Sequence, residues 1–440
     1  MAKIRKQHMS ISWHDMVTAG DSVSANEASL KEKATLVGRL GIMMLSVGTG
    51  AWRVRNSMNE ISRALGIMCS ADIGLVSIQC TCIEGEETYT QSLSIPNTGV
   101  NTDKLMELEI FMKDFPNMSD KYSVNQFHEM LDHIQNKKGN YGAWGLGLAA
   151  AIACGAFTFL LGGGITEMIC AFLGAGAGNF VRKKMIDRKI SLFANVGVSV
   201  AVSCAVYVVA ILVIQYLFGV SEMHQAGYIC AMLFVIPGFP LITGGIDMAK
   251  LDMRSGLERT SYALLIITIA TMTGWVTAML FRFQPADFPA LEIQAGLMIV
   301  FRMAASFFGV YNFSLMFNSP RKIALTAGLI GMFTNTLRLE LIDFCQFPIG
   351  LAAFIGAFCT GCIASVVKKK IGFPRISITV PAIVIMVPGL YMYRGIYHMA
   401  LSDVGNGALW LTKAMLIVVA LPVGLVAARL CTDKNFRHCT

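Results

Sequence analysis

From Tyr141 to its C-terminal end the sequence consists mostly of apolar stretches, each about 20 residues long. An α-helix needs a stretch of this length to cross the hydrocarbon core of a bilayer. Hydrophobic residues make up 55% of the 440-residue chain and charged residues only 15%, which is outside the usual composition of soluble globular proteins. The sequence therefore predicts a polytopic α-helical membrane protein.

We expect about ten transmembrane helices, five in each of two halves that cover residues 141–285 and 286–432. The predicted spans are 143–161, 165–181, 192–218, 226–245, 261–281, 293–314, 322–341, 348–367, 375–396 and 408–430. The second span is short and rich in glycine, so it is a candidate for a re-entrant segment.

The residues before Tyr141 contain nearly all of the long charged stretches, and no apolar run near Met1 resembles a signal peptide. We expect a disordered tail at 1–30 and a small cytoplasmic α/β domain at 31–140. With that domain inside, five predicted inner segments are basic, whereas the outer connections contain essentially no Lys or Arg. The inner segments are 182–189, 250–259, 321–322, 368–370 and the tail with Lys434 and Arg437. This pattern predicts the cytoplasmic (inner) membrane, with both termini cytoplasmic.

Two apolar stretches carry the same pattern, Pro-Gly, then five other residues, then a further Gly. The first is Pro237-Gly238 with Gly244, and the second is Pro388-Gly389 with Gly395. Proline removes a backbone donor and glycine relaxes the chain, so each pair should break a transmembrane helix. Broken backbone at membrane depth is tolerated where it is buried in protein or lines a cavity, and one isolated copy could reflect the general frequency of Pro and Gly in such helices.

The two copies lie in the fourth span of each half, and five spans per half place related halves in opposite orientations. Inverted repeats with facing broken helices are a recurring basis of alternating access in secondary transporters. We therefore predict that Pro237, Gly238, Pro388 and Gly389 bound a central substrate site.

Polar side chains inside the spans extend this predicted site. Arg302 and Arg338 are alternative ligands for a substrate carboxylate, because arginine binds carboxylates through two parallel hydrogen bonds. Each could instead form a structural ion pair or reach the membrane surface. Thr243 and Asn335 could donate hydrogen bonds to the substrate. Asp247 follows the first break and is the candidate for binding and releasing a coupling proton, unless it lies in a solvated turn.

In the region before the membrane spans, apolar spacing predicts helices at 33–47, 52–65, 103–115 and 124–135 and a β-hairpin formed by 74–83 and 87–95. We see no nucleophile, phosphate loop, cofactor motif or metal-ligand cluster in this sequence. His128 and His133 are expected on a solvated helix face. The region therefore suggests a regulatory or assembly module rather than an enzyme.

Three stretches resemble the threonine/serine exporter family. They are LVGRLGIMMLSVGTGAWRVRNSMNEISRALGI from Leu36, VIPGFPLITGGIDMAKLDMRSGLERTSYA from Val235, and the pair FNSPRK from Phe317 and MVPG from Met386. The resemblance covers almost the whole chain and implies proton-driven export, by antiport, of small hydrophilic amino acids such as threonine and serine. Second components of the split-type members carry Gly-His before the arginine of the seventh span, whereas this chain has Thr334-Asn335. A histidine proton relay is therefore not expected.

Three other functions stay open: export of small organic acids such as dicarboxylates, a passive small-solute channel, and a membrane-tethered enzyme or sensor. The expected partners are a small-molecule substrate, protons and the lipid bilayer, with a possible homo-oligomer and no nucleic acid. No cofactor or metal is expected.

Overall fold

The computed structural model describes residues 11–18, 22–220, 222–283 and 291–437. The chain forms two compact units. The first unit contains Met1–Gly139 together with Asp247–Arg259, and the second contains Asn140–Ile246 and Thr260–Thr440. The segment 247–259, which connects two helices of the membrane region in the sequence, therefore belongs to the N-terminal unit.

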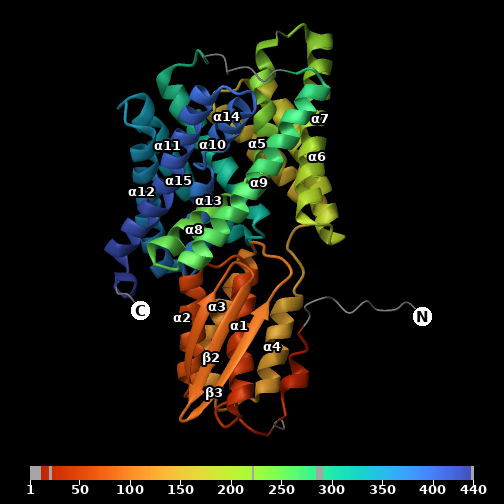
Figure 1. The fold of residues 1–440 in the computed structure, drawn as a ribbon. Helices are drawn as coiled ribbons and strands as arrows, with labels where there is room; N and C mark the ends of the chain where they lie inside the picture. The colour runs from red at the N-terminus through yellow and green to blue at the C-terminus, as the bar shows by residue number, and fades with distance from the viewer. Residues whose placement is uncertain (1–10, 19–21, 221, 284–290, 438–440) are drawn as a thin grey trace, which may run out of the picture. The chain divides into compact units, whose positions relative to one another are not determined.

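The first unit combines a layer of helices with a three-stranded antiparallel sheet of order β1-β2-β3 (Figure 1). Its elements are η1 (His14–Met16), α1 (Leu30–Ser46), α2 (Ala51–Ala64), β1 (Met68–Ile73), β2 (Ser77–Glu84), β3 (Glu87–Ser94), α3 (Thr102–Met118) and α4 (Val124–Asn136). The four predicted helices and the hairpin are present, whereas β1 was not predicted. Gly85 has a φ of 59° in the turn between β2 and β3, a conformation that glycine adopts without a steric penalty.

The side chains of β2 alternate, and the buried ones face the helices. Ile78, Cys80 and Cys82 are almost fully buried, and Gly41 of α1 packs so closely that a Cβ there would lie 3.2 Å from the Ile78 side chain. Helix α1 begins with a capping box in which Ser29 and Glu32 bond each other's backbone N–H groups.

The prediction that His128 is solvated was wrong. Its side chain is completely buried, and its ring stacks on Trp13 with the centroids 6.1 Å apart. Trp13 belongs to the segment predicted as a tail, which covers this face of α4. Burial, together with the nearby Arg39 guanidinium, lowers the pKa of His128 to about 3, so the ring is neutral at physiological pH.

The helices of the second unit follow the same order twice and mostly run side by side as a bundle (Figure 1). The first repeat contains α5 (Ala143–Leu160), α6 (Ile165–Asp187), α7 (Leu192–Phe218), η2 (Glu222–Val235), α8 (Gly238–Ala249) and α9 (Met253–Leu280). The second contains α10 (Ala295–Met316), α11 (Arg321–Asp343), α12 (Ile349–Ile371), α13 (Arg375–Val384), α14 (Gly389–Ala400) and α15 (Val404–Thr432), followed by η3 (Asn435–Arg437). The ends of α8 and α9 nearest their shared connection belong to the first unit.

Both Pro-Gly pairs break their helices, as predicted. The axis bends by 61° between 227–235 and α8, and by 52° between α13 and α14. Among the described residues, six helices are long and apolar enough to cross a membrane, or eight if each bent pair counts as one span. The chain is thus a polytopic helical membrane protein. The α6 segment is one continuous helix of 23 residues, so it does not have the broken course of a re-entrant segment.

Candidate functional site: the two helix breaks

The two breaks pack directly against each other. A Cβ on Gly238 would collide with Val384 and would lie 3.1 Å from Val387 Cγ2. A Cβ on Gly389 would lie 2.9 Å from Leu233 Cδ2 and 3.1 Å from an Ile236 side-chain atom. Val384 and Val387 lie five and two residues before Gly389, and Leu233 and Ile236 lie five and two residues before Gly238. The two sets of contacts are therefore equivalent. Only residues without a Cβ allow the half-helices to approach this closely.

Such reciprocal contacts are the mark of a two-fold axis, because residue i of one copy then touches residue j of the other and the reverse. Phe157 of α5 and Phe313 of α10 form a second contact of this kind, with ring centroids 5.4 Å apart. Both residues occupy corresponding places in the first helix of their repeat. These are the contacts that an internal pseudo-two-fold axis between the two breaks would produce.

Two of the predicted site residues are engaged elsewhere. The Thr243 hydroxyl donates to the carbonyl oxygen of Phe239 at 2.9 Å, within α8 itself. Arg302 of α10 donates to Glu340 Oε1 at 2.9 Å and also pairs with Asp343, both on α11. The ion-pair alternative therefore describes Arg302 in this structure, because its guanidinium already has two carboxylate partners.

Asn335 and Arg338 lie together on α11. The Asn335 amide donates to Ser306 Oγ at 2.9 Å, and its carbonyl oxygen accepts a hydrogen bond from Arg338 Nε at 3.1 Å. Asn335 is fully buried. Tyr391, two residues beyond Gly389, is among the groups that interact electrostatically with Arg338. The asparagine thus orients the guanidinium, whose other N–H groups can bind an anion.

Asp247 lies in the first unit and is almost completely buried. Its Oδ2 accepts from the Ser255 hydroxyl at 2.9 Å and from the backbone N–H of Ala51 at 3.1 Å, and it pairs with Arg259 at 3.2 Å. Arg259 in turn donates to the carbonyl oxygen of Thr49 at 2.7 Å. The carboxylate therefore caps the start of α2 and neutralises a buried arginine, while proton coupling through it stays a prediction.

The rest of the 247–259 segment is also joined to the first unit. The contacts of this attachment include Arg55 with Asp252 at 2.5 Å, Arg254 with Asp72, and the Leu75 N–H with Glu258 at 2.6 Å. Because α8 supplies both Gly238 of the second unit and Asp247 of the first, this one helix takes part in both.

Sequence reasoning missed Asn179 and Arg182 of α6. They occupy the same positions in the first repeat as Asn335 and Arg338 in the second, 156 residues earlier. The repeated Asn-x-x-Arg spacing was visible in the sequence, but Arg182 begins a run of basic residues that had been interpreted only as a topology signal.

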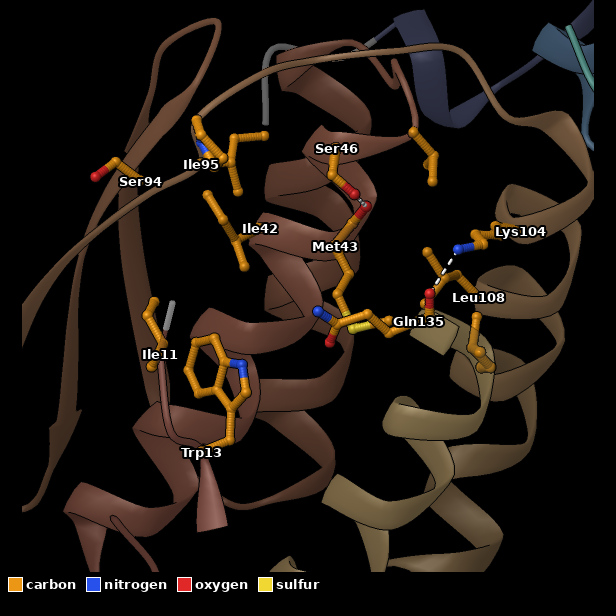
Figure 2. A pocket seen from close by; sticks show the side chains of 13 residues that line it. Ile11, Trp13, Ile42, Met43, Ser46, Ser94, Ile95, Lys104, Leu108 and Gln135 are labelled. Atoms are coloured by element: carbon orange, nitrogen blue, oxygen red, sulfur yellow. Dashed lines mark hydrogen bonds between the residues drawn. The ribbon is translucent and has the colours of Figure 1, made fainter. Parts of the chain in front are cut away.

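A separate cavity of about 300 Å³ lies within the first unit (Figure 2). Its lining is mostly apolar, with Trp13 and Ile42 on one side and Leu108 on the other. The Lys104 ammonium donates to the backbone carbonyl of Gln135 at 2.6 Å, and burial lowers the Lys104 pKa. A cavity of this size can hold a small molecule, but it contains none of the residues predicted for the substrate site.

Comparison with known proteins decides the family. The family model described as “Putative threonine/serine exporter” matches residues 35–282, more than half of the chain, and the model described as “Threonine/Serine exporter, ThrE” matches residues 302–431. The chain belongs to the threonine/serine exporter family. The two matched regions lie on either side of the boundary between the repeats, and each contains one of the helix breaks.

Among relatives, a “Probable threonine/serine exporter” from Mycobacterium tuberculosis is 23% identical over 88% of this chain and 74% of its own length. A “Probable succinate transporter subunit YjjP” from Klebsiella aerogenes is 24% identical over 58% of this chain and 96% of its own length. “Pheromone-regulated membrane protein 10” from Debaryomyces hansenii is 22% identical over 66% of this chain and 29% of its own length. No solved structure matches the chain. The protein is thus a membrane exporter of this family.

Proposed function

We propose that this exporter is a secondary transporter that moves small hydrophilic amino acids, threonine and serine among them, out of the cytoplasm in exchange for protons. The observation that carries the proposal is the reciprocal packing of Gly238 and Gly389 at a pseudo-two-fold axis. Two related half-helices that pack closely through a glycine on each can rock against each other, which is the motion that alternating access requires. The names of the family and of the Mycobacterium tuberculosis relative support the substrate class.

The same proposal includes a ten-span inverted repeat in the cytoplasmic membrane, with both termini in the cytoplasm. Its support is the equal order of elements in the two repeats and the basic segments on one predicted side. In this arrangement residues 31–140 and the attached 247–259 segment lie in the cytoplasm.

Arg338 is the proposed ligand of the substrate carboxylate, because Asn335 orients it and no Asp or Glu pairs with it among the residues that the structure describes. Arg302 is a weaker candidate, since Glu340 and Asp343 already neutralise it. Proton coupling through Asp247 belongs to the proposal as well.

A small dicarboxylate is the second substrate candidate, and the YjjP relatives named as succinate transporter subunits favour it. Both substrate classes carry a carboxylate, so the same arginine could serve either.

The deciding experiment is efflux of labelled threonine from proteoliposomes that contain the purified protein, with and without an imposed pH gradient. Unlabelled serine and succinate are the competitors. Gradient-stimulated efflux that serine inhibits is expected. Movement of succinate without threonine would overturn the amino-acid assignment, and efflux that neither saturates nor exchanges would indicate a channel.

A further inference from the structure

Asn179 and Arg182 repeat the arrangement of Asn335 and Arg338 in the other half of the second unit. Helix α6 runs from Ile165 to Asp187 and α11 from Arg321 to Asp343, so both are 23 residues long and their numbering differs by 156 throughout. Asn179 and Asn335 therefore occupy identical places in their helices, and so do the two arginines.

Both asparagines also donate a hydrogen bond to the first helix of their repeat. The Asn179 amide donates to the carbonyl oxygen of Leu146 on α5 at 2.7 Å, and the Asn335 amide donates to Ser306 on α10 at 2.9 Å. Both are buried, and each joins the second helix of its repeat to the first. The acceptors lie at different positions, and only in the second repeat does the asparagine also accept a hydrogen bond from its arginine.

Each arginine is associated with its own break. Arg182 Nη1 donates to the carbonyl oxygen of Phe234, directly before the first break, at 3.3 Å. Arg338 lies near Tyr391, two residues after the glycine of the second break. The Arg182 Nε is buried and has no hydrogen-bond acceptor among the described residues. That N–H group is available to a ligand.

Arg182 differs from the basic residues that follow it. Lys183 pairs with Asp187 at 2.6 Å, and Arg188 is exposed to the surroundings. Arg182 is half-buried, and no Asp or Glu of the described chain lies within ion-pair distance of it. A partly buried guanidinium without a carboxylate is costly, and a carboxylate from outside the chain would neutralise it through two parallel bonds.

We propose that Arg182, beside Asn179, forms a second carboxylate-binding site at the position in the first repeat that Arg338 occupies in the second. This proposal deepens the proposed function and rests on it, because it assumes a solute with a carboxylate. Both arginines lie near the C-terminal ends of their helices, and inverted repeats run these helices in opposite directions. The two sites therefore serve opposite ends of one path, Arg182 at the cytoplasmic end where export begins.

The test compares Arg182→Met with Arg188→Gln, which removes an exposed charge from the same basic segment. In reconstituted full-length protein, Arg182→Met should raise the threonine concentration for half-maximal efflux about tenfold to a hundredfold, the cost of a lost charge-assisted hydrogen bond. Arg188→Gln should match the wild type. Threoninol, in which a hydroxymethyl group replaces the carboxylate, should inhibit poorly in the wild type and nearly as well as threonine in Arg182→Met.

A second measurement is independent of transport. Threonine or succinate should raise the melting temperature of the detergent-solubilised wild type and of Arg188→Gln, and should do so less in Arg182→Met. If the wild type moves neither solute but shows this pattern, the proposed transport function fails and the site remains.

The site is refuted if Arg182→Met equals Arg188→Gln both in half-maximal concentration and in stabilisation by carboxylates. If Arg182→Met does not fold, Arg182→Lys is the second variant, because it keeps the charge but loses the planar pair of donors. It should still raise the threonine concentration for half-maximal efflux at least severalfold. Wild-type behaviour of Arg182→Lys would then overturn the proposal.

Discussion

Gly238→Ala tests the contact between the two breaks. The added methyl group would overlap with Val384, whose β-branched side chain has little rotational freedom to move away. Overpacking of this kind usually costs about 1 to 3 kcal/mol. In a unit of this size we expect the melting temperature to fall by about 2 to 10 °C. Threonine efflux should fall by more than the loss of folded protein accounts for.

The same reasoning predicts rescue. Val384→Ala removes the methyl groups that the new Cβ would meet, so Gly238→Ala/Val384→Ala should lose less stability than the sum of the two single variants. For residues in contact, a coupling of about 0.5 to 3 kcal/mol is typical. Gly405→Ala is the control, because a Cβ there meets nothing within 4 Å.

The assay is thermal unfolding of the purified full-length proteins in one detergent, with threonine efflux measured on the same preparations. Gly389→Ala should repeat the result, since its Cβ would lie 2.9 Å from Leu233 Cδ2, closer than the ordinary contact of about 3.5 to 4.0 Å. If Gly238→Ala is as stable and active as Gly405→Ala, the breaks do not pack as described.

Three further predictions concern charged and titratable groups. Burial lowers the His128 pKa to about 3, so below pH 6.5 the unfolded chain takes up a proton on this residue and the folded chain does not. The free energy of unfolding should therefore fall by about 1.4 kcal/mol from pH 7.5 to 5.5. In denaturant unfolding, His128→Phe should abolish this part of the pH dependence. Asp247→Asn removes the carboxylate that neutralises Arg259 and should cost about 3 to 5 kcal/mol in the same assay, with recovery in Asp247→Leu/Arg259→Met. Unchanged stability with efflux that no longer responds to pH would instead support proton coupling. Arg302→Gln should keep threonine efflux within a few-fold of wild type, because the structure gives that side chain two carboxylate partners, and a loss above tenfold would place Arg302 in the substrate site.

The features that sequence predicted well are those with a local cause. The Pro-Gly pairs break helices wherever they occur, so the bends at Gly238 and Gly389 follow from the residues themselves. The helices and the hairpin of the first unit follow from periodicity and from the turn at Gly85. Strand β1 escaped prediction because Met68–Ile73 contains Ser70 and Asp72 and lacks a long β-branched run.

The features that sequence did not predict depend on distant partners. His128 is buried because Trp13, over a hundred residues earlier, stacks on it. Arg302 is ion-paired because Glu340 lies opposite it on the next helix, 38 residues later in the chain. Asp247 was a candidate for proton coupling or for a solvated turn; it is buried, and its pairing with Arg259 and its place in the first unit need the folded chain.

The two repeats make matching contacts at the helix breaks, but the ends of α8 and α14 differ. Counting from the glycine of each break, Asp247 corresponds to His398, and Asp247 is buried against Arg259 whereas His398 pairs at 2.9 Å with Asp403. Both side chains of this second pair are partly exposed to the surroundings, so the pair contributes little stability. Helix α8 therefore ends in a buried residue that belongs to the first unit. If the first break moves, either Asp247 moves with it or α8 is strained over the nine residues from Gly238 to Asp247, about 13 Å of helix. We therefore expect the first unit to influence transport through α8.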